Sequence, residues 1–567
     1  MKEGEANMSY HHLQCRYSAW ILLSSLLTMV FASAHAASLS GVVTDASGQT
    51  IAGALIKVKS DDSRLLYMVV SQEGGRYSTP DLPSGSYTAQ GFGGGIQSEI
   101  SRPIEIAADS QTVHLTMNMP QKQYPPPKKE YTEDEFAAMM PDGEGKDLLL
   151  DKCTVCHSAG NFVSRRKTPT DWHDTVVKMR YRWEQVPALV QAYQARKGNQ
   201  DRPISDPQIE VMADYLTENF NLDIPPLFGT PHPDSHLPRT LLSGDAAKYL
   251  VMEMNLGDAL VGSYDIDADG IIWVSEKTSG ILGRFDPNSL SYTRIHTPPV
   301  NVTEEFFGGV AVDPDGNVWF SSNVVPDAQW FQYDPGNDEI INTYDVPLPT
   351  RPGGDIYFNS FAFPENGSIW SVMTAFHKVV KLDPETRAIK EFFMREGQHP
   401  FGMTIAGDGN IWYAADNDSL LVRIDPDTDE LTSFPLNPNT GPRRLATDAD
   451  GNLWTSAIDR SALVKMDYQT GEVTEYTPPS AHILQGLPIV EKYLQGVDVD
   501  KTRNLVWFSE YESIRLARYD PAADSFMEFS LATAESQPWI VKVDPKNSNR
   551  IWWNSRNGRI GYLELLQ

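Results

Sequence analysis

The chain has 567 residues, of which 41% are hydrophobic, so it is long enough to form several packed domains. Its formal net charge is −28, and the resulting negative field repels phosphate backbones and anionic lipid. We therefore expect neither nucleic acid nor a membrane surface as a partner. Basic proteins and cationic or neutral small molecules suit this charge better, although the acidity can also serve only to keep an exported protein soluble.

The N-terminal segment has the layout of a secretory signal peptide. Arg16 precedes an apolar run at residues 19–31, and small residues follow at Ala34 and Ala36. This layout predicts that residues 1–36 are a cleaved signal peptide and that the mature protein is periplasmic. The alternative is an uncleaved N-terminal anchor. No later stretch approaches the roughly 20 apolar residues of a membrane-spanning helix, so we expect no membrane span in the mature chain.

Residues 38–120 alternate apolar and polar positions between glycine turns, for example at Gly48, Gly53 and Gly85. Short strands at this spacing predict a small β-sandwich. The pattern resembles the carboxypeptidase regulatory-like domain family, and this resemblance implies an accessory module for adhesion, spacing or stability. Residues 121–130 follow with three consecutive prolines, which favour an extended, semi-rigid linker.

Helical patterns dominate residues 131–227, and this segment contains the run Cys153-Thr154-Val155-Cys156-His157. Two thiols at this spacing on a helical turn can add across the two vinyl groups of haem, and the adjacent imidazole then becomes an iron ligand. We therefore expect one covalent haem c, held by Cys153, Cys156 and His157 in an all-α cytochrome c domain.

Two other chemistries use a closely spaced cysteine pair. A zinc site would need a second cluster of thiol or imidazole ligands, but the only other cysteine is Cys15, inside the predicted signal peptide. A thioredoxin-like dithiol would need a βαβ setting, whereas the local pattern is helical. Haem attachment is the interpretation that the motif favours, and no disulfide framework is expected in the mature chain.

Several side chains are candidates for the second axial ligand of the iron. A thioether raises the reduction potential and suits electron transfer, which favours a methionine over His173. Residues 165–179 resemble a segment of the haem-bearing subunit of quinohaemoprotein amine dehydrogenases, and this resemblance implies Met179. Met212 is the other downstream methionine. Packing in the core is the alternative role for both methionines.

The remainder of the chain, residues 228–567, is built of repeats. A tryptophan recurs every 42 to 53 residues, usually after an Asp-Gly or Asn-Gly turn and one strand before an Asp-containing turn. The seven tryptophans are Trp273, Trp319, Trp370, Trp412, Trp454, Trp507 and Trp552. A period of this length with several short strands per unit is typical of propeller blades, so we expect a seven-bladed β-propeller.

The two ends of the repeat array complement each other. Most units finish with an outer strand, such as residues 526–529, but the last unit stops at residues 562–565 without one. A strand pattern at residues 249–254 precedes the first unit. Pairing of this strand with the last unit would close the ring and remove two exposed strand edges, whereas an open array would leave those edges bare.

The units resemble the virginiamycin B lyase family over nearly all of residues 228–567, on phrases such as Ile272-Trp273-Val274-Ser275-Glu276 and Val506-Trp507-Phe508-Ser509-Glu510. In that family, a histidine in the strand before a Trp-x-x-Glu phrase acts with the glutamate and magnesium to open a cyclic depsipeptide by elimination. The resemblance implies Glu276, Glu510 and His399 as catalytic candidates, with magnesium only under a lyase function. Glycine-containing segments precede both glutamates, and His399 lies in a unit without the glutamate. The alternative is that Glu276 and Glu510 are solvated or bonded to turns and have no functional role.

Together these patterns predict a mainly β, multidomain chain with a small β-sandwich, an all-α cytochrome c domain and a seven-bladed β-propeller. Our first functional hypothesis is a periplasmic monohaem c-type cytochrome, either an oxidoreductase or an electron relay. Its propeller would bind a small-molecule substrate or a partner, and its haem would pass electrons to another periplasmic carrier or redox subunit. The alternative is a carbon–oxygen lyase with an appended cytochrome domain. A third hypothesis makes the propeller and the sandwich interaction modules.

Overall fold

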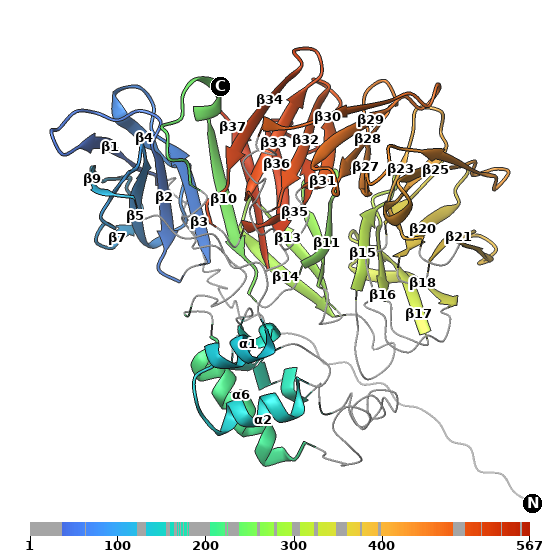
Figure 1. Ribbon diagram of the computed structural model, residues 1–567, viewed down its shortest axis with the longest axis horizontal. Helices are drawn as coiled ribbons and strands as arrows, with labels where there is room; N and C mark the ends of the chain where they lie inside the picture. The colour runs from blue at the N-terminus through green and yellow to red at the C-terminus, as the bar shows by residue number, and fades with distance from the viewer. Residues whose placement is uncertain are drawn as a thin grey trace, which may run out of the picture.

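The computed structural model consists of an N-terminal β domain, a helical segment and a β-propeller (Figure 1). It describes residues 37–62, 64–121, 132–154 and, with short gaps, 159–180, 204–224 and 237–566, the longer gaps in the last range being 297–306, 348–359 and 480–493. The predicted signal peptide and nearly all of the predicted linker lie outside these residues. Within the described part of the chain, no helix has both the length and the apolar character needed to span a bilayer.

Nine strands form the N-terminal β domain. They are β1 (Leu39–Asp45), β2 (Leu55–Ser60), β3 (Leu65–Val70), β4 (Arg76–Ser78), β5 (Gly85–Gly93), β6 (Ile96–Ser98), β7 (Ile104–Ile106), β8 (Gln111–Thr112) and β9 (Leu115–Pro120). β1 pairs with β4, β8 and β9, while β2 lies between β3 and β5. Alternate residues of β1, namely Leu39, Gly41 and Val43, are buried, as the predicted alternation requires.

Four helices are described between the β domain and the propeller: α1 (Glu133–Met139), α2 (Glu144–Lys152), α3 (Gly160–Val163) and α6 (Asp206–Asn219). α2 and α6 approach closely at Gly145, where an added Cβ would lie 2.2 Å from Cβ of Tyr215. Met212 is fully buried in the apolar core of this segment, in agreement with its alternative role in packing. These four helices do not show the all-α cytochrome domain that we expected from the sequence.

Six blades of the propeller are separate four-stranded antiparallel sheets (Figure 1). In chain order their strands are β11 (Val261–Ile266), β12 (Ile272–Glu276), β13 (Ile281–Asp286) and β14 (Ser291–His296); β15 (Phe307–Val312), β16 (Val318–Ser322), β17 (Asp327–Asp334) and β18 (Glu339–Pro347); β19 (Phe361–Ala362), β20 (Ile369–Met373), β21 (Lys378–Leu382) and β22 (Ile389–Phe393); β23 (Pro400–Ile405), β24 (Ile411–Ala415), β25 (Leu420–Ile424) and β26 (Leu431–Pro435); β27 (Pro442–Thr447), β28 (Leu453–Ala457), β29 (Ala462–Met466) and β30 (Val473–Tyr476); β31 (Leu494–Asp500), β32 (Leu505–Glu510), β33 (Arg515–Asp520) and β34 (Ser525–Ser530). The first strands of neighbouring blades contact one another, so these strands surround the propeller axis.

A hydrogen bond found in four of the units, among the described residues, links the tryptophan to the turn before it. The indole N–H of Trp273 donates to Asp267 at 2.8 Å, and that of Trp454 donates to Asp448 at 3.0 Å. The aspartate stands at the start of the turn between the first and second strands. The glycine of that turn has a positive φ, 80° at Gly270, which favours glycine because it lacks a Cβ. In these four units the turn is therefore hydrogen-bonded to a buried indole.

The last repeat takes its fourth strand from the chain before the first blade. It consists of β35 (Pro538–Val543), β36 (Arg550–Ser555), β37 (Arg559–Leu565) and β10 (Tyr249–Asn255), in which Tyr249 pairs with Leu565. This pairing confirms the predicted ring closure. On its other side β10 pairs with β3, Leu250 opposite Val69, so all these strands belong to one 13-stranded sheet. The prediction of seven separate blades is corrected to six, because the outer edge of β10 is bonded to the N-terminal domain.

Innermost strands of neighbouring blades approach so closely that two of them need a glycine at the contact. A Cβ added to Gly402 on β23 would lie 2.5 Å from the carbonyl oxygen of Arg443 on β27. A Cβ added to Gly496 on β31 would lie 2.6 Å from the backbone nitrogen of Val541 on β35. Both distances are far below van der Waals contact, and the atoms met belong to the backbone. Side chains at these positions would push neighbouring blades apart.

We expect Gly402→Ala to destabilise the propeller by about 1–3 kcal/mol, because overpacking against backbone cannot be relieved by a rotamer change. A lowered midpoint of thermal unfolding, followed by circular dichroism, would show this. Gly85→Ala on β5 is the control, since its Cβ would meet nothing nearer than 3.7 Å. Equal midpoints for the two variants would contradict the close approach of β23 and β27.

Candidate functional site

Three predicted catalytic candidates lie at one face of the propeller, where the first strand of a blade begins and the second strand ends. Glu276 is the last residue of β12 and pairs with Val261 at the start of β11. Glu510 ends β32 in the same way, opposite Leu494. His399 directly precedes β23. The antiparallel register of the blades therefore brings these residues to the same face of the ring.

Glu276 is bonded to the outer strand of its own blade. Its side chain is buried, and its Oε1 accepts hydrogen bonds from Tyr292 Oη and Arg294 Nε, both at 2.8 Å. Burial and the Glu276 carboxylate raise the pKa of Tyr292 well above its ordinary value, so this phenol stays protonated and donates. Because β14 carries both partners, Glu276 serves to hold the outer strand in place.

The carboxylate of Glu510 is also buried, and it accepts a hydrogen bond from Ser513 Oγ at 2.8 Å. Ser513 lies in the turn that follows β32. Among the residues that the structure describes, no three His, Cys, Asp or Glu side chains are grouped in a way that could hold a metal ion. Within the described residues, Glu276, Glu510 and His399 therefore do not form a cluster of this kind, and magnesium stays a prediction tied to the lyase function.

His399 has a carboxylate neighbour that the sequence analysis missed. Asp416 directly follows β24, and its Oδ1 lies 3.6 Å from Nδ1 of His399. The backbone N–H of Asp416 also donates to the carbonyl of His399 at 3.1 Å. Asn417 Nδ2 lies 3.1 Å from the same ring nitrogen. In two other units an acidic residue, Glu276 or Glu510, stands three positions after the tryptophan, whereas Asp416 stands four positions after Trp412. This acidic residue was the signal available in the sequence.

Burial lowers the pKa of His399 below its ordinary value, and the positive charge of Arg443 and the neighbouring His377 act in the same direction. Asp416 opposes this effect. The two imidazole rings are stacked, with centroids 4.9 Å apart. Nδ1 of His377 lies 2.8 Å from the carbonyl oxygen of Gln398, to which a protonated Nδ1 donates. His399 is therefore mainly neutral at pH 7 and is able to accept a proton.

Arg443 of β27 lies next to this pair and contacts aromatic rings of two other blades. Its guanidinium carbon is 4.8 Å from the ring centroid of Phe401 and 5.9 Å from that of Trp539, which lies two blades further on. Its Nε is 3.6 Å from Asp416. Aromatic faces stabilise a cation and fix its orientation. We call His399, Asp416, Phe401, Arg443 and Trp539 the inner cluster.

Of the predicted haem ligands, only Cys153 is among the described residues. It follows α2 directly, and its backbone N–H donates to Leu149 O at 2.8 Å. Its side chain is buried in the apolar core of the helical segment. Cys156, His157 and Met179 lie outside the described residues. His173, the other candidate, has its Nε2 3.4 Å from Glu210 Oε1.

Two parts of the sequence match known families. Residues 295–565 match the Virginiamycin B lyase family, and residues 38–120 match the Carboxypeptidase regulatory-like domain. Both matches agree with the resemblances found in the sequence. No curated protein matches the chain.

Solved structures of similar fold include two lyases. A virginiamycin B lyase from Staphylococcus aureus is 18% identical, with a TM-score of 0.47, and the match covers 56% of this chain and 100% of that one. A streptogramin B lyase is 20% identical, with a TM-score of 0.48 and coverage of 57% and 100%. The extracellular domain of a putative hybrid two-component system from B. thetaiotaomicron is 15% identical, with a TM-score of 0.41 and coverage of 53% and 40%.

We expect Asp416→Asn to lower the pKa of His399 further, because the carboxylate that favours the charged imidazolium is removed. The ring ¹³Cε1 resonance, assigned with His399→Gln and followed against pH, measures this shift. Asp450→Asn is the control, since Asp450 is exposed in a turn on the opposite face. A pKa that rises or does not move in Asp416→Asn would show that this carboxylate does not act on His399.

Proposed function

We propose that the propeller is a lyase-like module that binds a small-molecule substrate at the inner cluster and removes a proton from it. The supporting observation is the grouping of His399, Asp416 and Arg443 at strand ends of two neighbouring blades. This grouping lies within residues 295–565, the part of the chain that matches the lyase family. The comparisons favour this alternative over the electron-transfer hypothesis for the propeller.

In this proposal the cluster divides the chemistry among its members. Arg443 donates hydrogen bonds to a carbonyl oxygen of the substrate and so makes the neighbouring C–H bond more acidic. With the Asn417 amide turned so that its oxygen faces the ring, His399 carries its proton on Nδ1 and accepts the C–H proton at Nε2. The C–H electron pair forms a C=C bond as the C–O bond on the adjacent carbon breaks, and the oxygen leaves as a carboxylate. The step needs no further reactant.

The test uses quinupristin, the compound bound in a solved structure of an inactive virginiamycin B lyase variant. Elimination opens a depsipeptide ring without a change in mass, whereas hydrolysis adds one water, so mass spectrometry distinguishes the two reactions. We expect His399→Ala to lower kcat/KM by about 10²–10⁴-fold, the usual contribution of a general base. His296→Ala, on the exposed end of β14, is the matched control and leaves turnover unchanged. No turnover by the natural chain, or full turnover by His399→Ala, would reject the proposal.

A second proposal concerns the helical segment, which we propose carries one covalent haem c in a periplasmic protein. Its support is the C-x-x-C-H run together with the burial of Cys153 among apolar side chains at the end of α2. In this proposal Cys153 and Cys156 would hold the porphyrin by thioether bonds, and His157 and Met179 would bind its iron. Bound haem supplies one-electron transfer. The partner is another periplasmic electron carrier or redox subunit.

We expect the double variant Cys153→Ala/Cys156→Ala, expressed with residues 1–36 in a bacterium that makes c-type cytochromes, to lose covalently attached haem, because neither thioether bond can form. Haem staining after denaturing electrophoresis of a periplasmic extract, and the alkaline pyridine spectrum, measure attachment. Cys15→Ala is the control and retains the haem. A natural chain that is colourless and has free thiols at Cys153 and Cys156 would reject this second proposal and leave the lyase proposal untouched.

A further inference from the structure

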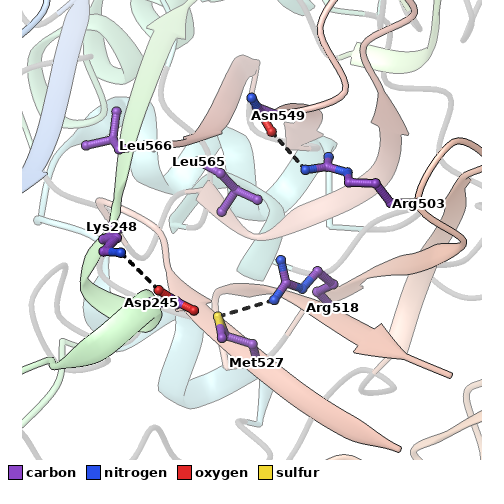
Figure 2. Close-up of a pocket in the computed structure, with 8 residues that line it drawn as sticks. All are labelled: Asp245, Lys248, Arg503, Arg518, Met527, Asn549, Leu565 and Leu566. Atoms are coloured by element: carbon purple, nitrogen blue, oxygen red, sulfur yellow. Dashed lines mark hydrogen bonds and ion pairs between the residues drawn. The ribbon is translucent and has the colours of Figure 1, made fainter. Parts of the chain in front are cut away.

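A small pocket of about 210 Å³ lies on the face of the propeller opposite the inner cluster (Figure 2). Its walls come from the 3-10 turn η2 (Gly244–Ala247) with the residue that follows it, from the β31–β32 turn and strands β33 and β34, and from the last repeat. The polar lining consists of Asp245, Lys248, Arg503, Arg518 and Asn549, and the apolar lining of Met527, Leu565 and Leu566. Three cations and one carboxylate therefore line a pocket in a chain of strongly negative net charge.

Arg518 occupies a position that is filled by a cation in several blades, opposite the repeat tryptophan. In the β19–β22 blade this position is Lys381, whose Nζ donates to Asp429 Oδ1 at 2.6 Å. In the β27–β30 blade it is Lys465, whose Nζ lies 3.7 Å from Asp448. Arg518 stands at the same register opposite Trp507. Within the described residues, the only acceptor of a hydrogen bond from its guanidinium is Met527 Sδ, at 3.8 Å (Figure 2).

The turn next to Arg518 also departs from the repeat. In four other units the aspartate of this turn accepts from the indole, but here Asp500 accepts from Arg503 Nε. The indole N–H of Trp507 is consequently buried without a partner among the described residues. Arg503 donates in addition to Asn549 Oδ1 at 2.8 Å and to the carbonyl of Ser548. All three nitrogens of its guanidinium thus donate to protein groups at the pocket wall.

The remaining charges leave Arg518 as the cation able to accept a ligand. Lys248 pairs with Asp245 at 3.2 Å, and the charge of Arg503 is balanced by Asp500. Burial lowers the pKa of Arg518 and Arg503 adds to this, whereas Asp520 and Asp245 oppose it; an arginine remains charged at neutral pH. A charged donor that is half-buried against a thioether is poorly solvated, and a carboxylate would supply strong charge-assisted hydrogen bonds to it.

We propose that this pocket binds a small monocarboxylate with a short apolar chain. The carboxylate accepts hydrogen bonds from the guanidinium of Arg518, and the apolar chain lies against Met527 and Leu565. The volume of about 210 Å³ is below that of pockets for drug-sized ligands, so the ligand has only a few carbon atoms. The site lies apart from the inner cluster and does not depend on either function proposed above.

Butyrate is the probe, and isothermal titration calorimetry of the full mature chain measures its binding. We expect butyrate to bind, Arg518→Gln to raise its Kd at least about tenfold, and the neutral isostere butyramide not to bind. Arg423→Gln is the matched control, because Arg423 stands at the same register opposite Trp412 in another blade, away from the pocket. This variant is expected to bind butyrate as the natural chain does.

A second variant, Leu566→Trp, tests the same pocket in case Arg518→Gln does not fold. Leu566 is 41% exposed at the rim, so Leu566→Trp is tolerated by the fold and blocks the pocket while leaving every charge in place. We expect it to abolish binding. Equal butyrate affinity in Arg518→Gln or in Leu566→Trp, equal affinity for butyramide, equally strong binding of inorganic phosphate, or no binding of butyrate below about 10 mM would each overturn the proposal.

Discussion

Pairing of β10 on both of its edges is the constraint on which the rest of the structure depends. β37 occupies one edge and β3 the other, so a single strand closes the ring and joins the N-terminal domain to it. An unpaired edge would expose backbone N–H and C=O groups and invite pairing with other chains. Both sides of the strand are also packed, since Val251 and Met252 are fully buried. The same strand therefore both closes the propeller ring and attaches the N-terminal β domain to it.

The closed ring turns a repeated pattern into unequal sites, because equivalent positions meet different neighbours. Glu276 meets a tyrosine and an arginine of its own outer strand and becomes a structural anchor. The blade with His399 lacks that glutamate, and Asp416 supplies a carboxylate one residue later. At the position opposite the tryptophan, Lys381 is paired with Asp429, whereas Arg518 in another blade lines a pocket. Small departures from the repeat thus mark the candidate sites.

Net charge and local charge lead to different conclusions about ligands. The formal charge of −28 led us to expect cationic or neutral partners. Yet the inner cluster presents Arg443 between two aromatic rings, and the pocket on the other face presents Arg518. Both arginines are partly enclosed by protein, where nearby groups outweigh the screened field of distant surface carboxylates. The sites therefore favour ligands with an anionic or strongly accepting oxygen.

The sequence by itself determined the blade pattern, the strand that closes the ring and the positions of the helices. These features depend on local contacts, such as the bond from Trp273 to Asp267 six residues earlier, or on a missing strand that is visible as a gap in the repeat. Only the tertiary structure decided that β3 extends the sheet of the last repeat, that Asp416 faces His399 and that Arg518 borders a pocket. Such contacts join segments far apart in the chain through strand register, and register between distant strands leaves no periodic trace in the sequence.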